Sequence, residues 1–278
     1  MKDHEEGVSA MASTAPEPVV TEEMEEIAPR LTHEQLGELL ALLQGSDSVE
    51  LKVTVPQADR RATVERLGMD VLDAEIRQVA FFDTPDLRLF EHGVVVRARR
   101  IQRRDGDSVV KLRPVDPAHL TDKLRKAAGF GVEVDALPGG FVCSARMKAK
   151  VEDGLLRRVF AGEKAVHKLF TKHQRSLFED HAPDGIALDD LAVLGPINIL
   201  KLKFTPEGYP RPLVVELWSY PDGGQILELS TKCAPADAFA VTAETKEFLA
   251  ARGVDLGAPQ QTKTRTALAY FAGGGDDG

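Results

Sequence analysis

Short segments with a side-chain period of two recur along this chain, and they limit its fold more than any other feature. In residues 49–55 every second residue is valine or leucine, and Glu50 and Lys52 lie between them. Alternate residues of a β-strand point to opposite faces, so the pattern predicts a strand with one apolar and one polar face. Residues 94–101, 107–113, 197–204 and 225–232 repeat it. The chain therefore predicts many short, half-buried strands.

Turn and cap signals order these strands among helices. Strands are expected at about 48–55, 77–83, 94–101, 107–113, 130–136, 170–177, 185–192, 197–204, 213–219 and 225–232. Helices are expected at about 32–44, 56–68, 144–169, 235–252 and 260–271. Residues 104–107 (RDGD) and 221–224 (PDGG) predict hairpin turns between neighbouring strands. This order predicts an antiparallel α+β protein built around a β-barrel with flanking helices.

The polar faces of the strands carry pairs of charged residues two positions apart. These pairs are Arg97 and Arg99, Lys111 and Arg113, Lys201 and Lys203, and Glu133 and Asp135, and the last strand places Glu228, Ser230 and Lys232 on one face. Charges on a half-exposed strand are usually solvated. If the faces instead line a barrel, like charges repel by about 4 kcal/mol at ~4 Å and an effective dielectric near 20. Acids, water or a polyanion must then offset the bases, and phosphate oxygens suit both Arg and Lys.

The net charge of −9 is concentrated at the two ends of the chain. Residues 1–26 hold eight acids against Lys2, and Asp276 and Asp277 lie at the other end. Residues 27–275 hold 34 bases and 34 acids. We therefore expect a neutral folded body that can accept an anionic ligand, and we expect no DNA partner because no generally basic surface is indicated. Residues 1–28 show no apolar period, which predicts a disordered acidic tail.

The sequence shows no pattern typical of a membrane span, a secretion signal or a cysteine metal site. No run approaches the roughly 18 apolar residues of a membrane span, and the acidic N-terminal segment lacks the order of a secretion signal. Cys143 and Cys233 are far apart and show no metal-ligand spacing. We expect two reduced thiols in a cytoplasmic protein that makes no membrane contact.

Several segments, in order, resemble motifs of the CYTH or triphosphate tunnel metalloenzyme superfamily. Residues 48–52 (SVELK) resemble its Glu-x-Glu-x-Lys strand, 81–87 (FFDTPDL) its Tyr-Phe-Asp-Thr-Pro strand end, and 93–99 (GVVVRAR) its Leu-Arg-x-Arg strand. Residues 109–112 (VVKL), 188–190 (LDD) and 262–263 (TK) resemble its next basic strand, its Leu-Asp motif and its C-terminal Ser-Lys. The resemblance covers roughly residues 48–270.

The resemblance implies a closed, eight-stranded or slightly larger antiparallel tunnel that binds triphosphate through inward bases. It also implies one or two Mg²⁺ or Mn²⁺ ions held by inward carboxylates. The family's activities include hydrolysis of inorganic triphosphate, thiamine triphosphate or RNA 5′-triphosphate, cyclisation of ATP and polyphosphate synthesis. The motifs carry over Lys52, Arg97, Arg99, Lys111 and Lys263 as phosphate ligands and Glu50 as a metal ligand. Arg113, Lys201, Lys203 and Lys232 complete the candidate phosphate-binding set.

The chain departs from the family pattern at its acidic positions. Ser48 replaces the first acid of Glu-x-Glu-x-Lys, and the late Glu-x-Glu strand falls on Lys201-Leu202-Lys203 or on Glu228-Leu229-Ser230. Either alignment removes at least one metal-binding carboxylate. Because Mg²⁺ usually takes one or two carboxylates plus phosphate oxygens and water, a metal site is still possible. Its candidate ligands are Glu50, Glu133, Asp135, Asp189, Glu216 and Glu228.

Motifs of other functional classes are absent or weak in this sequence. The chain has no Gly-x-Gly-x-x-Gly, no Walker loop and no His-Glu-x-x-His. Its seven histidines show no ligand spacing; His167 or His173 could act as a base, although packed or surface roles are commoner. Trp218 is a packing residue or a stacking surface for a ring.

We therefore expect one tunnel domain over residues 29–272, with a flexible tip at 273–278. The favoured function is metal-dependent hydrolysis of a small molecule that carries a triphosphate. Two alternatives stay open: a non-catalytic module that binds polyphosphate or nucleotide, and an adenylate cyclase.

Overall fold

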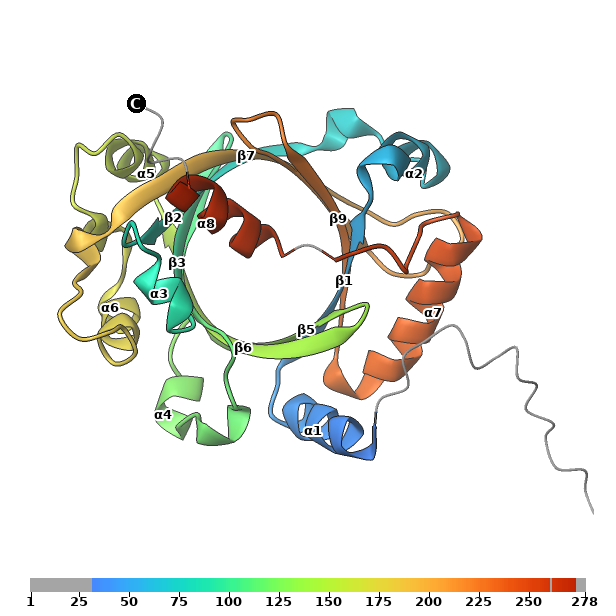
Figure 1. Ribbon diagram of the computed structural model, residues 1–278, viewed down its shortest axis with the longest axis horizontal. Helices are drawn as coiled ribbons and strands as arrows, with labels where there is room; N and C mark the ends of the chain where they lie inside the picture. The colour runs from blue at the N-terminus through green and yellow to red at the C-terminus, as the bar shows by residue number, and fades with distance from the viewer. Residues whose placement is uncertain (1–31, 261, 274–278) are drawn as a thin grey trace, which may run out of the picture.

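The expected strand alternation closes into one ring in the computed structural model, which describes residues 32–260 and 262–273 (Figure 1). The strands are β1 (Ser48–Val55), β2 (Glu75–Asp83), β3 (Val94–Ile101), β4 (Arg104–Leu112), β5 (Phe130–Leu137), β6 (Gly140–Val151), β7 (Ala192–Phe204), β8 (Leu213–Ser219) and β9 (Gln225–Cys233). The α-helices are α1 (His33–Gln44), α2 (Arg60–Arg66), α3 (Arg88–Glu91), α4 (Asp122–Arg125), α5 (Asp153–Phe160), α6 (Lys172–Glu179), α7 (Ala238–Ala251) and α8 (Lys263–Gly273). Short 3₁₀ turns include η5 (Val166–Leu169) and η6 (Leu188–Asp190).

The barrel order is β1-β5-β6-β4-β3-β2-β7-β8-β9, and β9 pairs with β1 to close the ring. Neighbouring strands are antiparallel except β1 and β5, which run parallel with Ser48 opposite Glu133. A closed ring with an odd number of strands cannot alternate in direction throughout, so at least one parallel pair is unavoidable. The predicted barrel with flanking helices is confirmed, as a mixed rather than wholly antiparallel ring.

Most helices pack on the outer face of the barrel, around the ring in Figure 1. Leu156 of α5 and Phe178 of α6 are buried in a cluster that includes Val96 and Val110 from β3 and β4. A second cluster joins Phe248 of α7 to the strands around β8 and β9. Because the apolar strand faces point outward to these helices, the charged faces point into the barrel.

Helix α8 is placed differently, because it lies across the opening of the ring (Figure 1). Its Ala267 and Leu268 are 0% and 2% exposed and belong to a cluster with Phe81, Val95 and Trp218. Val95 and Trp218 also line the central cavity. The C-terminal helix is therefore docked on the inward faces of the strands and narrows one end of the tunnel.

Two predicted elements between residues 144 and 177 need correction. The segment predicted to be mainly helical, 144–169, is a strand as far as Val151, since Ala145 and Met147 are buried and alternate with Arg146 and Lys148, and only its second part is helical, as α5 and η5. The strand predicted at 170–177 is helix α6, which begins with a Thr171–Gln174 capping box. Burial of every second residue therefore identifies the first segment as a strand, and the capping box identifies the second as a helix.

Smaller corrections concern two other segments. Residues 185–192, predicted as a strand, contain the 3₁₀ turn η6 and only the first residue of β7. The hairpin between β3 and β4 turns at Gln102 and Arg103, where Arg103 has φ 67°, rather than at 104–107. The turn at 221–224 and the helices predicted near 32–44, 56–68, 235–252 and 260–271 are confirmed.

The predicted acidic tail, residues 1–28, lies outside the described residues, as does the tip beyond Gly273, which itself ends α8. Among the described helices none is long and apolar enough to cross a membrane. Cys143 and Cys233 are both free thiols, and Cys143 is buried.

Candidate functional site

The inward strand faces enclose a cavity of about 1190 Å³. Twelve Lys and Arg residues line it against six Asp and Glu residues. Side chains two positions apart on a strand point into this cavity, as those of Arg97 and Arg99 on β3 do. A cavity with this excess of positive charge, inside a protein whose net charge is negative, favours an anionic ligand.

The bases gather on neighbouring strands and form what we call the basic wall. It consists of Arg97, Arg99, Lys111, Arg113, Arg146 and Lys148, carried by β3, β4, β6 and the residue after β4. The register places Lys111 opposite Arg146 and Val109 opposite both Arg97 and Lys148. Three adjacent strands thus present one continuous cationic surface to the cavity.

The carboxylates gather on the other side of the ring and form the acidic wall. It consists of Glu133 and Asp135 on β5, Glu50 on β1, Glu228 on β9 and Glu216 on β8. The register places Glu50 opposite Asp135 and Glu216 opposite Glu228. The tunnel is therefore polarised across its width, with bases facing acids.

Asp135 is the centre of one ion-pair network at the boundary between the walls. Its side chain is fully buried, and Lys52, Lys111 and Arg113 approach its oxygens at 2.7, 3.2 and 3.5 Å. Burial alone would raise the pKa of Asp135, but these three cations outweigh it and hold the pKa far below the ordinary value. Burial lowers the pKa of Lys111 to about 8, despite the opposing attraction of Asp135.

A second network surrounds Lys263, the first residue of α8. Its Nζ lies 2.5 Å from Glu216 and 2.8 Å from Glu228, and Lys201 also pairs with Glu216 at 3.2 Å. Burial opposes the charge of Lys263, but the two carboxylates raise its pKa. Burial likewise opposes the charge of Glu216, yet Lys263 and Lys201 hold its pKa well below the ordinary 4.5. The two ion pairs of Lys263 stabilise the contact of α8 with β8 and β9.

Two guanidinium groups of the basic wall, those of Arg97 and Arg146, have no ion-pair partner among the described residues, unlike that of Arg99. Arg99 makes two hydrogen bonds to Asp107, at 2.9 and 3.0 Å. Arg97 and Arg146, by contrast, have no hydrogen bond or ion pair with any described residue. The Nε of Arg97 is buried without a partner, and burial followed by repulsion from Arg99 lowers the pKa of Arg97 to about 10. A buried, unpaired cation is costly unless a ligand supplies the counter-charge.

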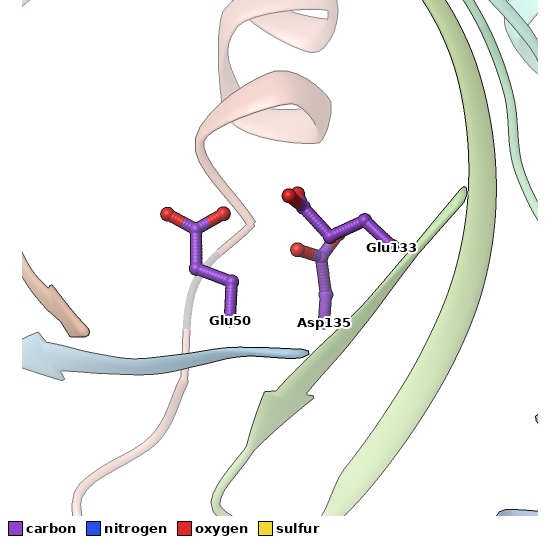
Figure 2. Close-up of side chains that lie close together, drawn as sticks. All are labelled: Glu50, Glu133 and Asp135. Carbon is purple, nitrogen blue, oxygen red and sulfur yellow. The ribbon is translucent and has the colours of Figure 1, made fainter. Parts of the chain in front are cut away.

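Three carboxylates of the acidic wall lie close enough to share a cation. Oxygens of Glu50, Glu133 and Asp135 are all within 4.8 Å of one another, and Figure 2 shows them gathered beside adjacent strands. Lys232 forms an ion pair with Glu133 Oε2, although this buried oxygen has no partner with the geometry of a hydrogen bond. Carboxylate oxygens are the ligands that Mg²⁺ and Mn²⁺ prefer. The residues present therefore fit a divalent cation.

Most of the predicted site residues line the cavity; Asp135 is fully buried but pairs with lining residues, and two others lie apart. Lys203 is exposed at the end of β7 and does not line the cavity, although Lys201 does. Asp189 lies outside the barrel, where it accepts hydrogen bonds from the backbone N–H of His167 at 2.9 Å and contacts the imidazole. Glu216 and Glu228 are inward but belong to the Lys263 network rather than to the three-carboxylate cluster.

Five functional candidates were missed by reasoning from sequence. They are Arg77, Asp107, Arg146, Lys148 and Arg265. Arg146 and Lys148 alternate with apolar residues, which indicates a strand, but the segment as a whole predicts a helix. Asp107, which pairs with Arg99 and Lys148, belongs to the turn that the sequence predicts. Arg265 lines the cavity only because α8 docks at the tunnel opening, and no local pattern indicates that.

A scan against protein-family models finds no match, and a search of curated proteins finds none either. Solved structures do match. A putative adenylate cyclase from Bacillus halodurans is 14% identical, with a TM-score of 0.57 over 80% of this chain and 97% of its own. The putative adenylyl cyclase HpAC1 from Hippeastrum is 15% identical, with a TM-score of 0.59 over 81% and 96%.

This chain has the fold of those proteins. The closed barrel tunnel expected from the sequence motifs is thereby confirmed as a fold. The Hippeastrum protein is described as having a dominant triphosphatase activity. At these levels of identity the likeness establishes the fold alone.

Proposed function

We propose that the protein binds a small molecule carrying a triphosphate inside the tunnel, together with one divalent cation, and hydrolyses its terminal phosphoryl group. The observation that carries the proposal is Arg97, a half-buried residue of the basic wall whose buried Nε has no hydrogen-bond partner and whose guanidinium forms no ion pair with a described residue. The chain of phosphates supplies the anions that Arg97 and Arg146 lack. Arg is suited to this role because its planar fork matches phosphate oxygens.

In this proposal the basic wall binds and orients the phosphates. Arg97, Arg99 and Lys148 lie towards one end of the tunnel, while Lys111 and Arg113 lie towards the other. This length of wall suits a linear chain of phosphates rather than a single anion. Because phosphoryl transfer is catalysed chiefly by positioning and charge neutralisation, a preformed cationic surface directly lowers the barrier.

Glu50, Glu133 and Asp135 would hold the divalent cation on the acidic wall. Such a cation supplies Lewis-acid polarisation of phosphoryl oxygens. The chain's own lysines share these carboxylates, since Lys52 pairs with Glu50 at 3.3 Å and with Asp135 at 2.7 Å. Lys52 therefore offsets part of the negative charge of Glu50 and Asp135, and because it also lines the cavity it is placed to contact a phosphate.

The first experiment measures phosphate release by the full-length protein from tripolyphosphate, thiamine triphosphate and ATP with Mg²⁺ or Mn²⁺. We expect release from at least one of them, and we expect EDTA to abolish it. Cyclic AMP is assayed in the ATP reaction, because cyclisation releases pyrophosphate instead of orthophosphate. No turnover of any of the three would refute the hydrolase proposal.

A second experiment tests the cation site without relying on activity. Glu133→Gln removes one carboxylate charge from the cluster, and we expect Mn²⁺ affinity to fall at least about tenfold. Free Mn²⁺ is counted by electron paramagnetic resonance, with Glu38→Gln on the exposed face of α1 as the matched control. Equal Mn²⁺ affinity in the two variants would remove Glu133 from the site.

A non-catalytic polyanion-binding module is the second candidate, and a specific observation favours it. Lysines or arginine already approach both oxygens of Asp135, and Lys232 pairs with Glu133, so the acidic wall is neutralised without a metal. Calorimetry separates the two functions. Tripolyphosphate binding that is unchanged by EDTA, together with no phosphate release, would support the module.

A further inference from the structure

Bases gather at one end of the tunnel, and we call this end the basic mouth. Five of the residues that line the cavity define it: Arg77, Arg99, Lys148, Lys201 and Lys232. They lie near the start of β2 and towards the ends of β3, β6, β7 and β9, which the strand register places at the same end of the barrel. Helix α8 docks at the opposite end, against Val95 near the start of β3 and Ile226 near the start of β9.

Carboxylates offset only part of the positive charge of the basic mouth. Each of its five bases has one of four ion-pair partners: Glu75 for Arg77, Asp107 for Arg99 and Lys148, Glu216 for Lys201, and Glu133 for Lys232. Glu75 also pairs with Arg104, and Glu216 also pairs with Lys263. Because three of these carboxylates are each shared between two bases, they are too few to neutralise the mouth.

Further bases lie at the rim of the basic mouth, and they have no partners. Lys150 and Lys203 are exposed at the ends of β6 and β7, where they continue the inward faces of these strands, and Arg103 is exposed in the adjoining hairpin turn. None of the three makes a hydrogen bond or an ion pair with a described residue. Asp105 and Glu152 are exposed carboxylates of the same region. The three rim bases are therefore solvated cations that an anionic group at the mouth can pair with.

A strongly acidic segment of the chain is attached close to this mouth. Residues 17–26 hold five glutamates and no base. They precede α1, which ends four residues before β1, and β1 starts at the same end of the barrel, since Val49 lies opposite Cys233 at the end of β9. Helix α1 also contacts the 3₁₀ turn η7 (Pro235–Asp237), which follows β9. The acidic segment and the basic mouth are thus joined by one helix.

The chain before α1 is long enough for the acidic segment to reach back to the mouth. Helix α1 has 12 residues and is therefore about 18 Å long. Glu26 is six residues and Glu17 fifteen residues before Thr32, the N-cap of α1. An extended chain covers up to about 20 Å over the first interval and about 50 Å over the second. The glutamates therefore reach the mouth even if α1 points away from it.

We propose that residues 17–26 dock on the basic mouth, where their glutamates pair with the rim bases Arg103, Lys150 and Lys203. In this position the segment competes with phosphates that enter the tunnel from this end, so the chain carries its own inhibitor of the site. The docking follows from charge and reach and is independent of the reaction. The competition rests on the proposed function, because it requires that phosphates bind in the tunnel.

The docking is tested without a ligand, by cross-linking the full-length protein with a carbodiimide, which joins a carboxylate directly to a lysine that it contacts. The reaction is run at low salt and low protein concentration, and cross-linked peptides of the monomer are identified by mass spectrometry. We expect residues 17–26 to be joined to Lys150, to Lys203 or to a lysine that lines the mouth. Links from this segment only to lysines elsewhere, such as Lys164 or Lys246, links only between two copies of the chain, or no links at all would overturn the inference.

The competition is tested by calorimetric titration of tripolyphosphate at low salt, in EDTA to prevent turnover. One full-length variant carries Glu22→Gln, Glu23→Gln, Glu25→Gln and Glu26→Gln. The matched control changes the net charge equally, at exposed acids of α6, the loop after it and α7: Glu179→Gln, Asp180→Asn, Asp184→Asn and Glu247→Gln.

We expect the first variant to bind tripolyphosphate at least about threefold more tightly than the control does, because several weak exposed ion pairs are lost together. The difference should shrink at high salt, which screens exposed charges. Equal affinity of the two variants would refute the competition and leave phosphate binding intact. Failure of tripolyphosphate to bind the unmodified protein and both variants would refute the proposed function, while the cross-linking result still decides the docking.

Discussion

Replacing Arg97 with methionine tests two effects of its unpaired charge. One is the loss of folding stability that the charge causes, and the other is its contribution to phosphate binding. Arg97 has no described partner, whereas its neighbour Arg99 on the same face of β3 is held by Asp107 through two hydrogen bonds. The two arginines are therefore a matched pair in the same cavity. Arg97→Met and Arg99→Met are expected to change stability in opposite directions.

The magnitude for Arg97 follows from its pKa, which falls from 12.5 to about 10, mainly through burial. One pKa unit corresponds to about 1.36 kcal/mol, so the fold disfavours the charged form by roughly 3 kcal/mol. A cation whose folded pKa is lowered is still charged at pH 7 and therefore destabilises the protein there. Arg97→Met removes this cost, and we expect stabilisation of up to about 3 kcal/mol, less any packing that is lost.

Arg99→Met has the opposite consequence. It leaves Asp107, which is 3% exposed, with only Lys148 as an ion-pair partner. Removing one member of a buried ion pair typically costs about 3–5 kcal/mol. In a domain of this size, 1 kcal/mol corresponds to about 2–4 °C in melting temperature, so Arg99→Met should lower the melting temperature by about 6–20 °C, and Arg97→Met should not lower it.

Binding should respond differently from stability. Hydrogen bonds to charged groups contribute about 1.5–3 kcal/mol, so we expect Arg97→Met to weaken tripolyphosphate binding by about 10- to 150-fold. The assay is thermal unfolding with and without tripolyphosphate, combined with calorimetric titration in EDTA. A variant that is less stable than the unmodified protein and binds tripolyphosphate normally would refute the reasoning, because Arg97 would then have a structural role.

Two further predictions concern the buried polar groups around the tunnel. Glu216→Gln should lower the free energy of unfolding by about 3 kcal/mol at pH 7, because Lys201 and Lys263 lose their shared anion. Since the folded pKa of Glu216 is well below 4.5, its contribution is complete above about pH 4.5 and is lost as the pH falls further. Urea unfolding should therefore show the difference between variant and parent shrinking in acid, and a difference that stays constant would contradict the ion-pair explanation. Gln174→Leu should cost about 2 kcal/mol, since the fully buried amide of Gln174 donates to two strand carbonyls at 3.0 and 3.1 Å. Gln102→Leu in an exposed turn is the control, and equal stability of the two variants would show that these hydrogen bonds contribute nothing.

The sequence predicts the strands of this fold wherever alternation is regular. The segments 48–55, 94–101 and 213–219 have the expected bounds. Prediction fails at 144–151, which is the second half of strand β6, and at 170–177, which is mostly helix α6. A stretch such as Arg146–Val151 contains residues that favour either structure, and pairing with β4 and β5 decides it.

The candidate site, too, is predictable from the sequence only in part. The inward bases on β3 and β4 follow directly from period two, because side chains two apart share a face whatever the strand pairs with. The grouping of Glu50 with Glu133 and Asp135 could not be predicted, since it depends on the parallel pairing of β1 with β5, in which Glu50 lies opposite Asp135. Likewise, the carboxylates expected to bind metal at Glu216 and Glu228 are paired with Lys263 because α8 returns to the barrel.

The sequence by itself determines which residues share a strand face, and therefore that a closed barrel of this chain has a charged interior. Only the tertiary structure decides which of those charges meet. Ring closure sets the basic wall on β3, β4 and β6 against the acidic wall on β5, β1, β9 and β8, and it leaves Arg97 without a partner. The physical reason is range: alternation is a property of adjacent residues, whereas ion pairing requires contacts within about 4 Å between strands distant in the chain.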